Sequence, residues 1–433
     1  MATDRPNILY IHSHDTGRYV QPYGHAIATP ALQRLAEQGV LFRKAFCAAP
    51  TCSPSRASLL TGQHAHNSGM LGLAHRGFSL NNYGQHILHT LRKVGYYSAL
   101  IGEEHIAQDR STIGYDFVAN LEGFQASIVA PAAVQTLRSL PQPFMLSVGF
   151  FETHREFLQP GTQEDANYSL PPAPLPDTPQ IRRDIASFKA SARELDQGIG
   201  TVLAELEAHG LDANTLVICT TDHGIPFPRM KCNLTDSGIG VMLLLRGPGG
   251  FSGGRVSDSL VSQIDLYPTI CDLAGVEHPD WLQGEALLPL LSDETAQLHD
   301  AIFAEVNYHA AYEPQRAVRT ERWKYIRSFE HHLGPVLANC DDGPSKNTLI
   351  EYGWKERSRP LELLYDLIFD PHEACNMAND QSCAVVLEEM RTRLDEWMRR
   401  TNDPLLHGRV VAPIGAQLND PNQVSPTDPT FIA

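Results

Sequence analysis

The chain has 433 residues, of which 42% are hydrophobic and 19% charged, a balance typical of a globular protein and not of a disordered one. Its formal net charge at pH 7 is -16, which disfavours nucleic acids and anionic membranes as partners. A site for an anionic substrate therefore has to gather its own positive charge from Arg, Lys, His or a metal.

The N-terminus leads directly into a strand-like run, with no apolar segment typical of a signal peptide or a membrane span. The eight cysteines are scattered without paired spacing, which in a long chain indicates reduced thiols and not a disulfide framework. From these two features we expect a cytoplasmic location.

Strand and helix patterns alternate along the first 299 residues. Strands are expected at residues 7–12, 97–101, 144–148 and 216–220, and helices from residue 29 and over roughly 180–209. Unbroken apolar runs of this length are typical of strands buried on both faces of a sheet. The alternation predicts one large, doubly wound, mixed α/β sheet for residues 1–299.

The pattern changes at about residue 300. Four strand-like runs, at 301–306, 315–319, 323–327 and 364–367, follow one another through short turns, and a helical pattern covers 384–400. The tail after residue 402 is rich in Pro, Asn and Asp, and we expect it to be irregular. Residues 300–433 are thus predicted to form a smaller C-terminal unit, an antiparallel sheet with one helix.

The most specific motif covers residues 52–62, CSPSRASLLTG. A Cys in a Ser-rich loop is usually a small buried residue, but the eleven consecutive positions here resemble the type I sulfatase signature, Cys-x-Pro-Ser-Arg followed by Leu-Thr-Gly. The resemblance implies the alkaline phosphatase-like fold and the oxidation of Cys52 to formylglycine. One hydroxyl of its hydrate attacks sulfur, and the other later expels sulfate from the covalent intermediate. Arg56 is implied to steady the ionised diol.

Two further motifs follow predicted strands, where open α/β sheets place ligands. Asp222 and His223 come after the strand at 216–220, and His14 and Asp15 come after the first strand. Taken alone, Asp222 also suits a capping role. The resemblance implies a divalent metal bound by Asp15, Asp222, His223 and the residue from Cys52.

His14 departs from the family pattern, which has Asp-Asp at positions 14 and 15, both binding calcium. Calcium prefers oxygen ligands, whereas imidazole suits zinc, manganese or iron. We expect calcium, with Mn²⁺ or Zn²⁺ as the alternatives if His14 is itself a ligand.

A narrower resemblance extends over nearly the whole chain. Segments at 27–30, 42–46, 69–73, 195–200, 222–228 and 365–373 are similar to the heparan N-sulfatase (sulfamidase) branch of the sulfatases. This similarity implies three substrate-binding and catalytic residues. His105 contacts the transferring group, His154 protonates the leaving group, and Lys231 binds the sulfate oxygens.

Glu103 stands where the family has a lysine. Together with the Asp-to-His change at position 14, this exchange suggests that His14 and Glu103 face each other and form one charge-balanced wall of the substrate pocket. Four other histidines carry weaker expectations. His64 and His66 either line the pocket or cap the signature helix, and His331 and His332 lie in a loop that suits a substrate-selecting rim.

The leading interpretation is a sulfatase that cleaves sulfate esters or sulfamates, with sulfated sugars as candidate substrates. A phosphonate monoester or phosphodiester hydrolase with the same nucleophile is the first alternative, and a non-catalytic binding protein of the same fold is the second. Maturation requires a formylglycine-generating enzyme as a partner, and a homo-oligomer is possible.

Overall fold

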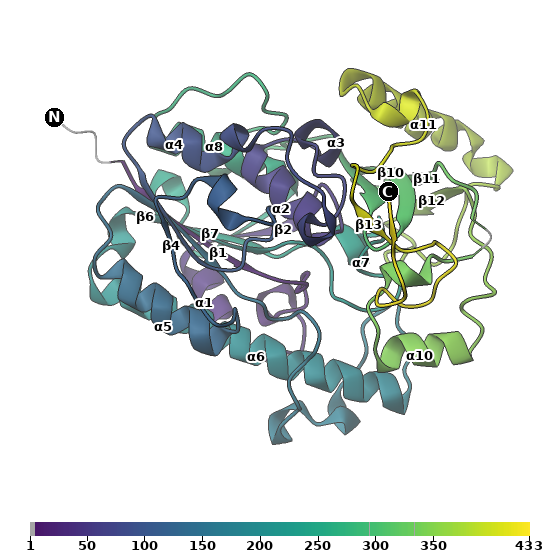
Figure 1. Ribbon diagram of the computed structural model, residues 1–433, viewed down its shortest axis with the longest axis horizontal. Coiled ribbons are helices and arrows are strands. Elements are labelled where there is room, and N and C mark those ends of the chain that lie inside the picture. Colours follow the sequence, from purple (N-terminus) through teal and green to yellow (C-terminus); the bar gives the residue numbers. More distant parts are fainter. Residues whose placement is uncertain (1–4, 294, 333) are drawn as a thin grey trace.

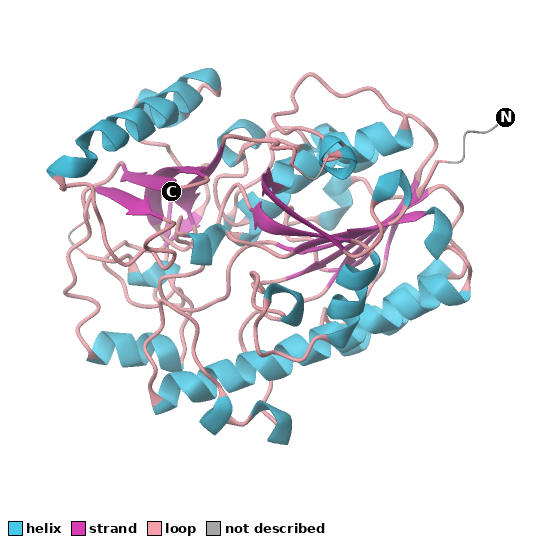
Figure 2. Ribbon diagram, turned by 180° about the vertical axis from the view of Figure 1, so that it is seen from behind, coloured by secondary structure: helices cyan, strands magenta, loops and turns pink. Residues whose placement is uncertain are grey.

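The computed structural model describes residues 5–293, 295–332 and 334–433, which form two adjoining units, each built on a sheet (Figures 1 and 2). The larger sheet has eight strands in the order β4-β3-β5-β1-β6-β7-β2-β8. Its strands are β1 (Asn7–Ser13), β2 (Val40–Phe46), β3 (Tyr97–Gly102), β4 (Phe117–Val118), β5 (Phe144–Gly149), β6 (Thr215–Thr221), β7 (Leu243–Arg246) and β8 (Arg255–Ser262). β7 runs antiparallel to its two neighbours, so the sheet is mixed, as predicted.

The four strands that the sequence predicted, β3, β5, β1 and β6, are adjacent and parallel at the centre of this sheet. Gly102, Gly149, His12 and Thr220 lie side by side across them. Their carboxyl ends therefore meet at one edge. β2, β7 and β8 were not predicted, because β7 is short and the other two interrupt their apolar residues with charged or polar ones.

Helices cover both faces of the large sheet (Figure 1). One face carries α1 (Pro30–Gln38), α5 (Ala126–Leu137) and α6 (Pro179–Ala208), and the other carries α2 (Cys52–Thr61), α4 (Ile87–Arg92) and α8 (Leu266–Ala274). Successive residues of a strand point to opposite faces. Accordingly, Leu9 and Ile11 pack in the first layer, and Ile8 and Tyr10 pack in the second.

The smaller unit is an antiparallel sheet of order β12-β11-β10-β9. Its elements are β9 (Ala301–Tyr308), β10 (Tyr312–Thr320), β11 (Trp323–Ser328), β12 (Glu362–Asp366) and α11 (Ala384–Arg400). α11 covers one face, where Val318 and Tyr325 pack against it. The other face joins the core of the large unit through residues such as Val306. The fold class predicted from the sequence is confirmed, while the boundary at 299/300 stays a prediction.

Shorter elements complete the chain. They are α3 (Ala65–Ser68), α7 (Asp236–Ile239), α9 (Pro289–Ser292), α10 (Pro344–Glu351), β13 (Gln417–Leu418) and β14 (Phe431–Ile432). In the tail that we expected to be irregular, β13 pairs with β14; two-residue strands are too short to leave a sequence pattern. All eight cysteines are unpaired. Within the described ranges, no helix combines the length and apolar character needed to cross a bilayer.

Candidate active site

The carboxyl ends of four adjacent strands bring together most of the residues expected to carry chemistry. His105 follows β3, His154 follows β5, His14 and Asp15 follow β1, and Asp222 and His223 follow β6. Parallel strands place their carboxyl ends at a common edge, which explains why residues far apart in sequence converge here.

Asp15 and Asp222 form the centre of the site and are fully buried. The backbone N–H of Asp15 donates to Asp222 Oδ1 at 2.8 Å. His14 Nδ1 lies 3.1 Å from Asp222 Oδ2 and 3.4 Å from Asp15 Oδ1. Burial raises the pKa of both carboxyls, but surrounding cations, Lys231 for Asp15 and Arg56 for Asp222, help to hold each pKa well below its usual range. Both groups are therefore carboxylates at neutral pH.

Cys52 is the first residue of α2, and its side chain points into this site. Ser55, one turn along the helix, donates from Oγ to the carbonyl of Asp222 at 2.5 Å and so fixes the start of α2 against the end of β6. Cys52 is only 2% exposed, and its Sγ lies 3.4 Å from His223 Nε2. Burial raises the pKa of the thiol well above its ordinary value. An unmodified Cys52 would thus be a thiol and a poor nucleophile at neutral pH.

The hydrogen bonds of His223 fix its tautomer. Its Nδ1 lies 2.9 Å from the carbonyl of Gly224, which can only accept, so Nδ1 carries a proton. In the neutral ring Nε2 then has a free lone pair, and it lies 3.3 Å from Asp15 Oδ1 as well as close to Cys52. A ring held in this way is suited to binding a metal.

The donor atoms at this point fit a divalent metal. His14, Asp15, Cys52 and Asp222 each offer one ligand atom, and these atoms all lie within 4.8 Å of one another. Two carboxylates suit a hard cation, whereas the imidazole of His14 suits manganese or zinc better than calcium. Burial and the nearby charge of Arg56 lower the pKa of His14 to about 4, so the ring is neutral and can act as a ligand.

Arg56, on the buried face of α2, is held by three acceptors. One terminal nitrogen donates to His12 Nδ1 at 2.6 Å, and the other donates to the carbonyl of Ser13 at 2.9 Å and to Asp222 Oδ2 at 3.0 Å. Its Nε–H has no partner among the described residues. His12, which the sequence did not single out, must accept from the guanidinium and is neutral, because burial holds its pKa well below the ordinary value.

Lys231 is 3% exposed and binds two carboxylates. Its Nζ lies 2.8 Å from Asp15 Oδ2 and 3.0 Å from Asp341 Oδ2. Burial lowers the pKa of this lysine, but the two aspartates outweigh that effect and raise it well above its ordinary value. Asp341 was missed because it lies in a loop of the C-terminal unit, and no local motif marks it.

His105 makes a contact that the sequence did not predict. Its Nε2 lies 2.8 Å from His75 Nδ1, and the two rings stack with centroids 5.0 Å apart. Its Nδ1 is buried and has no partner in the described part of the chain. Burial, with His14 and His75 nearby, holds the pKa of His105 well below its ordinary value, so the ring is neutral.

His154 lies at the other side of the same group of rings. Its Nδ1 lies 2.6 Å from the carbonyl of Arg155 and therefore donates to it, while its Nε2 lies 3.9 Å from Asp15 Oδ2. The ring packs edge-on against His14 with centroids 5.2 Å apart. His154 is half-buried, so a substrate group can approach Nε2.

The expected pairing of His14 with Glu103 was wrong. The ring of His14 pairs with the two aspartates, whereas the carboxyl group of Glu103 accepts from the backbone of Glu104 and interacts with Arg56 and Arg110. Strand order explains the difference, because β5 lies between β3, which Glu103 follows, and β1, which His14 follows. Burial raises the pKa of Glu103, and Arg56 opposes that shift.

The other four histidines that the sequence singled out lie outside this site. His64 Nε2 accepts from Trp397 Nε1 at 3.2 Å, and His66 Nδ1 lies 2.7 Å from Glu305 Oε1, so both join α3 to the C-terminal unit. His331 and His332 line a separate cavity in that unit.

The charges of the site are unbalanced without a metal. Three buried carboxylates, Asp15, Asp222 and Asp341, face two cations, Arg56 and Lys231. An anionic substrate would be repelled by this set, and a divalent cation would reverse the sign. A sheet edge with this nucleophile position, these aspartates and these histidines defines a hydrolase of the alkaline phosphatase superfamily.

Comparison with known proteins agrees with that class. The sulfatase family model matches residues 6–276, and the model of the N-sulphoglucosamine sulphohydrolase C-terminal region matches residues 230–350. Human N-sulphoglucosamine sulphohydrolase is 31% identical over 461 residues, with 92% of this chain and 91% of the human protein covered. An ulvan-active sulfatase of Formosa agariphila is 27% identical, with 92% and 76% covered. This chain belongs to the sulfatase family.

A solved structure supports the fold independently. A protein bound to its substrate, D-glucosamine-2-N,6-O-disulfate, superimposes with a TM-score of 0.75 at 20% identity, covering 92% of this chain and 98% of the other. The expected resemblance to the sulfamidase branch is confirmed by the human relative and by the C-terminal model. The protein is thus a sulfuric ester hydrolase by family, and the alternative of a non-catalytic binding protein loses its support.

Proposed function

We propose that this protein is a formylglycine-dependent sulfatase that removes sulfate from sulfated sugars, by cleavage of a sulfate ester or a sulfamate. The observation that carries the proposal is the convergence of Cys52, Arg56, Asp15 and Asp222 at one buried point, with His223 beside the thiol. The sugar substrate is proposed because the similar proteins act on, or are bound to, sulfated sugars.

The residues have separate tasks in this proposal. Formylglycine at position 52 would supply the attacking hydroxyl and later release sulfate by returning to the aldehyde. Arg56 keeps its Nε–H as a buried donor, and Lys231 brings a second cation to the sulfate oxygens. His105 can donate from Nδ1 to a sulfate oxygen, and His154 can pass a proton to the departing oxygen or nitrogen from Nε2 when its ring is protonated.

The metal would be held by Asp15, Asp222, His223, His14 and the residue from Cys52. It would supply positive charge to the sulfate group and favour the ionised nucleophile. We propose calcium on the family resemblance. The imidazole of His14 lowers the preference for calcium relative to manganese or zinc, so metal analysis of the purified protein distinguishes these ions.

Maturation would require a formylglycine-generating enzyme. Cys52 is buried in the folded chain, so we expect that enzyme to act before α2 packs against the sheet. The unpaired cysteines support a reducing, cytoplasmic location. A homo-oligomer stays a prediction from the sequence.

The test is to co-express the chain with a formylglycine-generating enzyme and to follow nitrophenol release from nitrophenyl sulfate, with Cys52→Ala as the control. The proposal expects hydrolysis that the substitution abolishes, and an intact mass that shows conversion of Cys52. Activity restricted to an aryl phosphonate or phosphodiester, and lost in Cys52→Ala, would replace it with the phosphonate or phosphodiester hydrolase. Equal rates for the two proteins would reject Cys52 as the nucleophile.

A further inference from the structure

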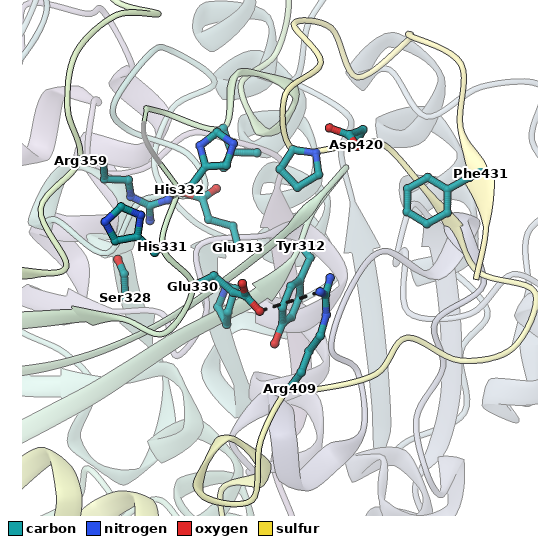
Figure 3. A pocket seen from close by; sticks show the side chains of 13 residues that line it. Tyr312, Glu313, Ser328, Glu330, His331, His332, Arg359, Arg409, Asp420 and Phe431 are labelled. Carbon is teal, nitrogen blue, oxygen red and sulfur yellow. Dashed lines mark ion pairs between the residues drawn. The ribbon is translucent and has the colours of Figure 1, made fainter.

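A second cavity, of about 310 Å³, lies in the C-terminal unit (Figure 3). It is enclosed by the start of β10, the segment at 328–332 and the C-terminal tail. Tyr312 and Glu313 come from β10, His331 and His332 from the following segment, and Phe431 from β14 of the tail. Its volume is at the lower end of the range of small-molecule sites, roughly 300–1,000 Å³, which suits a single ring and not a long chain.

The charged groups of this cavity already neutralise one another. Arg359 lies 2.6 Å from Glu313 Oε1, and Arg409 lies 4.0 Å from Glu330 Oε1, the pair joined by a dashed line in Figure 3. Asp420 adds one further negative charge to the lining. Both arginines of the cavity are thus matched by a glutamate, so neither guanidinium is left over to bind a sulfate group.

The remaining chemistry suits an uncharged, hydroxyl-rich ring. Paired carboxylates and guanidinium groups offer acceptors and donors side by side, which hydroxyl groups can bridge. The Arg409 guanidinium lies 4.5 Å over the ring of Tyr312, and Phe431 of the C-terminal tail, which is 50% exposed, offers an aromatic face (Figure 3). Apolar faces combined with a few convergent polar groups are typical of sites that fix the orientation of a small ligand.

A short segment separates this cavity from the candidate active site. Asn339 Nδ2 donates to Glu313 Oε2, at the cavity, at 2.6 Å, and Asp341, two residues on, pairs with Lys231 at 3.0 Å. Two residues of extended chain span at most about 7 Å. His309, in the turn that precedes Tyr312, is buried, and Lys231 and Asp341 are among the charged groups that act on it. The two sites therefore share a wall.

We propose that this cavity is a subsite for a neutral sugar residue of the substrate, next to the sulfated residue held in the active site. The inference rests on the proposed function, since it names the part of the substrate that this second site binds. In this proposal His331 and His332 contact the neutral sugar and not the sulfate group. It also predicts that the enzyme prefers a chain with an unsulfated neighbouring sugar to a monosaccharide or to a chain sulfated on both sugars.

The test is calorimetric titration of the full chain carrying Cys52→Ala, so that no ligand is consumed. The ligands are N-sulfoglucosamine, a disaccharide that joins it to an unsulfated neutral hexose, and the same disaccharide sulfated on both rings. We expect the singly sulfated disaccharide to bind about tenfold more tightly than either of the others, the factor typical of one added aromatic contact.

Phe431→Ala in the same background should remove that tenfold advantage and leave the monosaccharide affinity unchanged. Ile432→Ala is the matched control, because Ile432 is the next residue of β14, is also exposed (64%) and does not line the cavity. The proposed subsite would be overturned if the monosaccharide and the singly sulfated disaccharide bound with equal affinity, if the doubly sulfated ligand bound more tightly, or if neither disaccharide bound. An equal loss of disaccharide affinity in Phe431→Ala and Ile432→Ala would also overturn it. Nitrophenyl sulfate contains no sugar, so its hydrolysis tests the proposed function separately.

Discussion

Arg56 and Arg316 are two buried arginines that hold carboxylates in different regions of the molecule. Arg316, on β10, uses all of its nitrogens: it binds both oxygens of Asp403, donates to two backbone carbonyls, and also reaches Asn307 and Glu305. Arg56 leaves Nε–H without a partner among the described residues.

The carboxylates around the two arginines also differ in how fully protein groups satisfy their oxygens. Glu305 accepts from His66 and Asn307 as well as from Arg316, so both of its oxygens are satisfied by protein groups. Asp15 and Asp222 each pair with one cation and also contact the neutral ring of His14, and the negative charges of their site exceed the positive ones. A buried ion cluster that is complete holds two units together, whereas one that is incomplete has capacity for a metal and a substrate.

The largest expected effect is on stability, at Arg316. Arg316→Met would leave Asp403 and Glu305 buried without their cation, and we expect the free energy of unfolding to fall by about 3–5 kcal/mol. The kcat of the fraction that remains folded should change little. Urea unfolding followed by tryptophan fluorescence measures the first quantity. A stable variant that has lost kcat would reverse the roles assigned to the two clusters.

The matching change in the active site is Arg56→Lys. Lysine keeps the positive charge but cannot reach His12, Ser13 and Asp222 together, nor supply the free Nε–H. We expect kcat for nitrophenyl sulfate to fall by about 10²–10³, as when one charge-stabilising donor is removed. Steady-state kinetics on protein with verified formylglycine content measures this kcat. An unchanged kcat would contradict the role of Arg56.

The third prediction concerns pH and His64, which stacks on His66 beside the Arg316 cluster. Burial, with His66 nearby, lowers the pKa of His64 to about 3. Below pH 6.5 the unfolded chain binds a proton at this residue that the folded chain does not, so stability falls as the pH falls. Between pH 6.5 and 4.5 this group alone removes roughly 2 kcal/mol from the free energy of unfolding.

The control is His64→Gln, because a glutamine oxygen can still accept from Trp397 Nε1 and does not titrate. Urea titrations of both proteins between pH 7 and 4.5 should show a steeper loss for the unmodified chain. Parallel curves would show that His64 is protonated in the folded protein.

The smallest expected effect is at His75, which touches the site only through His105. When His75 Nδ1–H donates to His105 Nε2, the proton of neutral His105 lies on Nδ1, the buried nitrogen that has no partner among the described residues. His75→Ala should lower kcat/KM about tenfold, as is typical when the group that orients a functional histidine is lost. His75→Asn, whose amide can still donate, should restore most of the activity.

Nitrogen NMR of the His105 ring would report its tautomer directly. A ring that keeps its proton on Nδ1 in His75→Ala, with unchanged kinetics, would show that His75 has no positioning role.

Much of the fold was predictable from local pattern. The apolar runs that became β1, β3, β5 and β6 are buried on both faces, so nothing interrupts them, and α11 matches its expected range. β8 was not predicted because its first half alternates between half-buried and exposed positions. Its place is set by pairing with β2, which lies about 215 residues earlier in the chain.

The sequence by itself determined which residues could carry the chemistry, because Cys52, Arg56, Asp15, Asp222 and His223 lie in motifs of fixed spacing or at the ends of predicted strands. Only the tertiary structure decided how these groups are paired. It turned His14 toward the aspartates and away from Glu103, and it brought Asp341 to Lys231 and His75 to His105. Pairings of this kind depend on strand order and on contacts between loops, and neither leaves a trace in the residues beside the groups themselves.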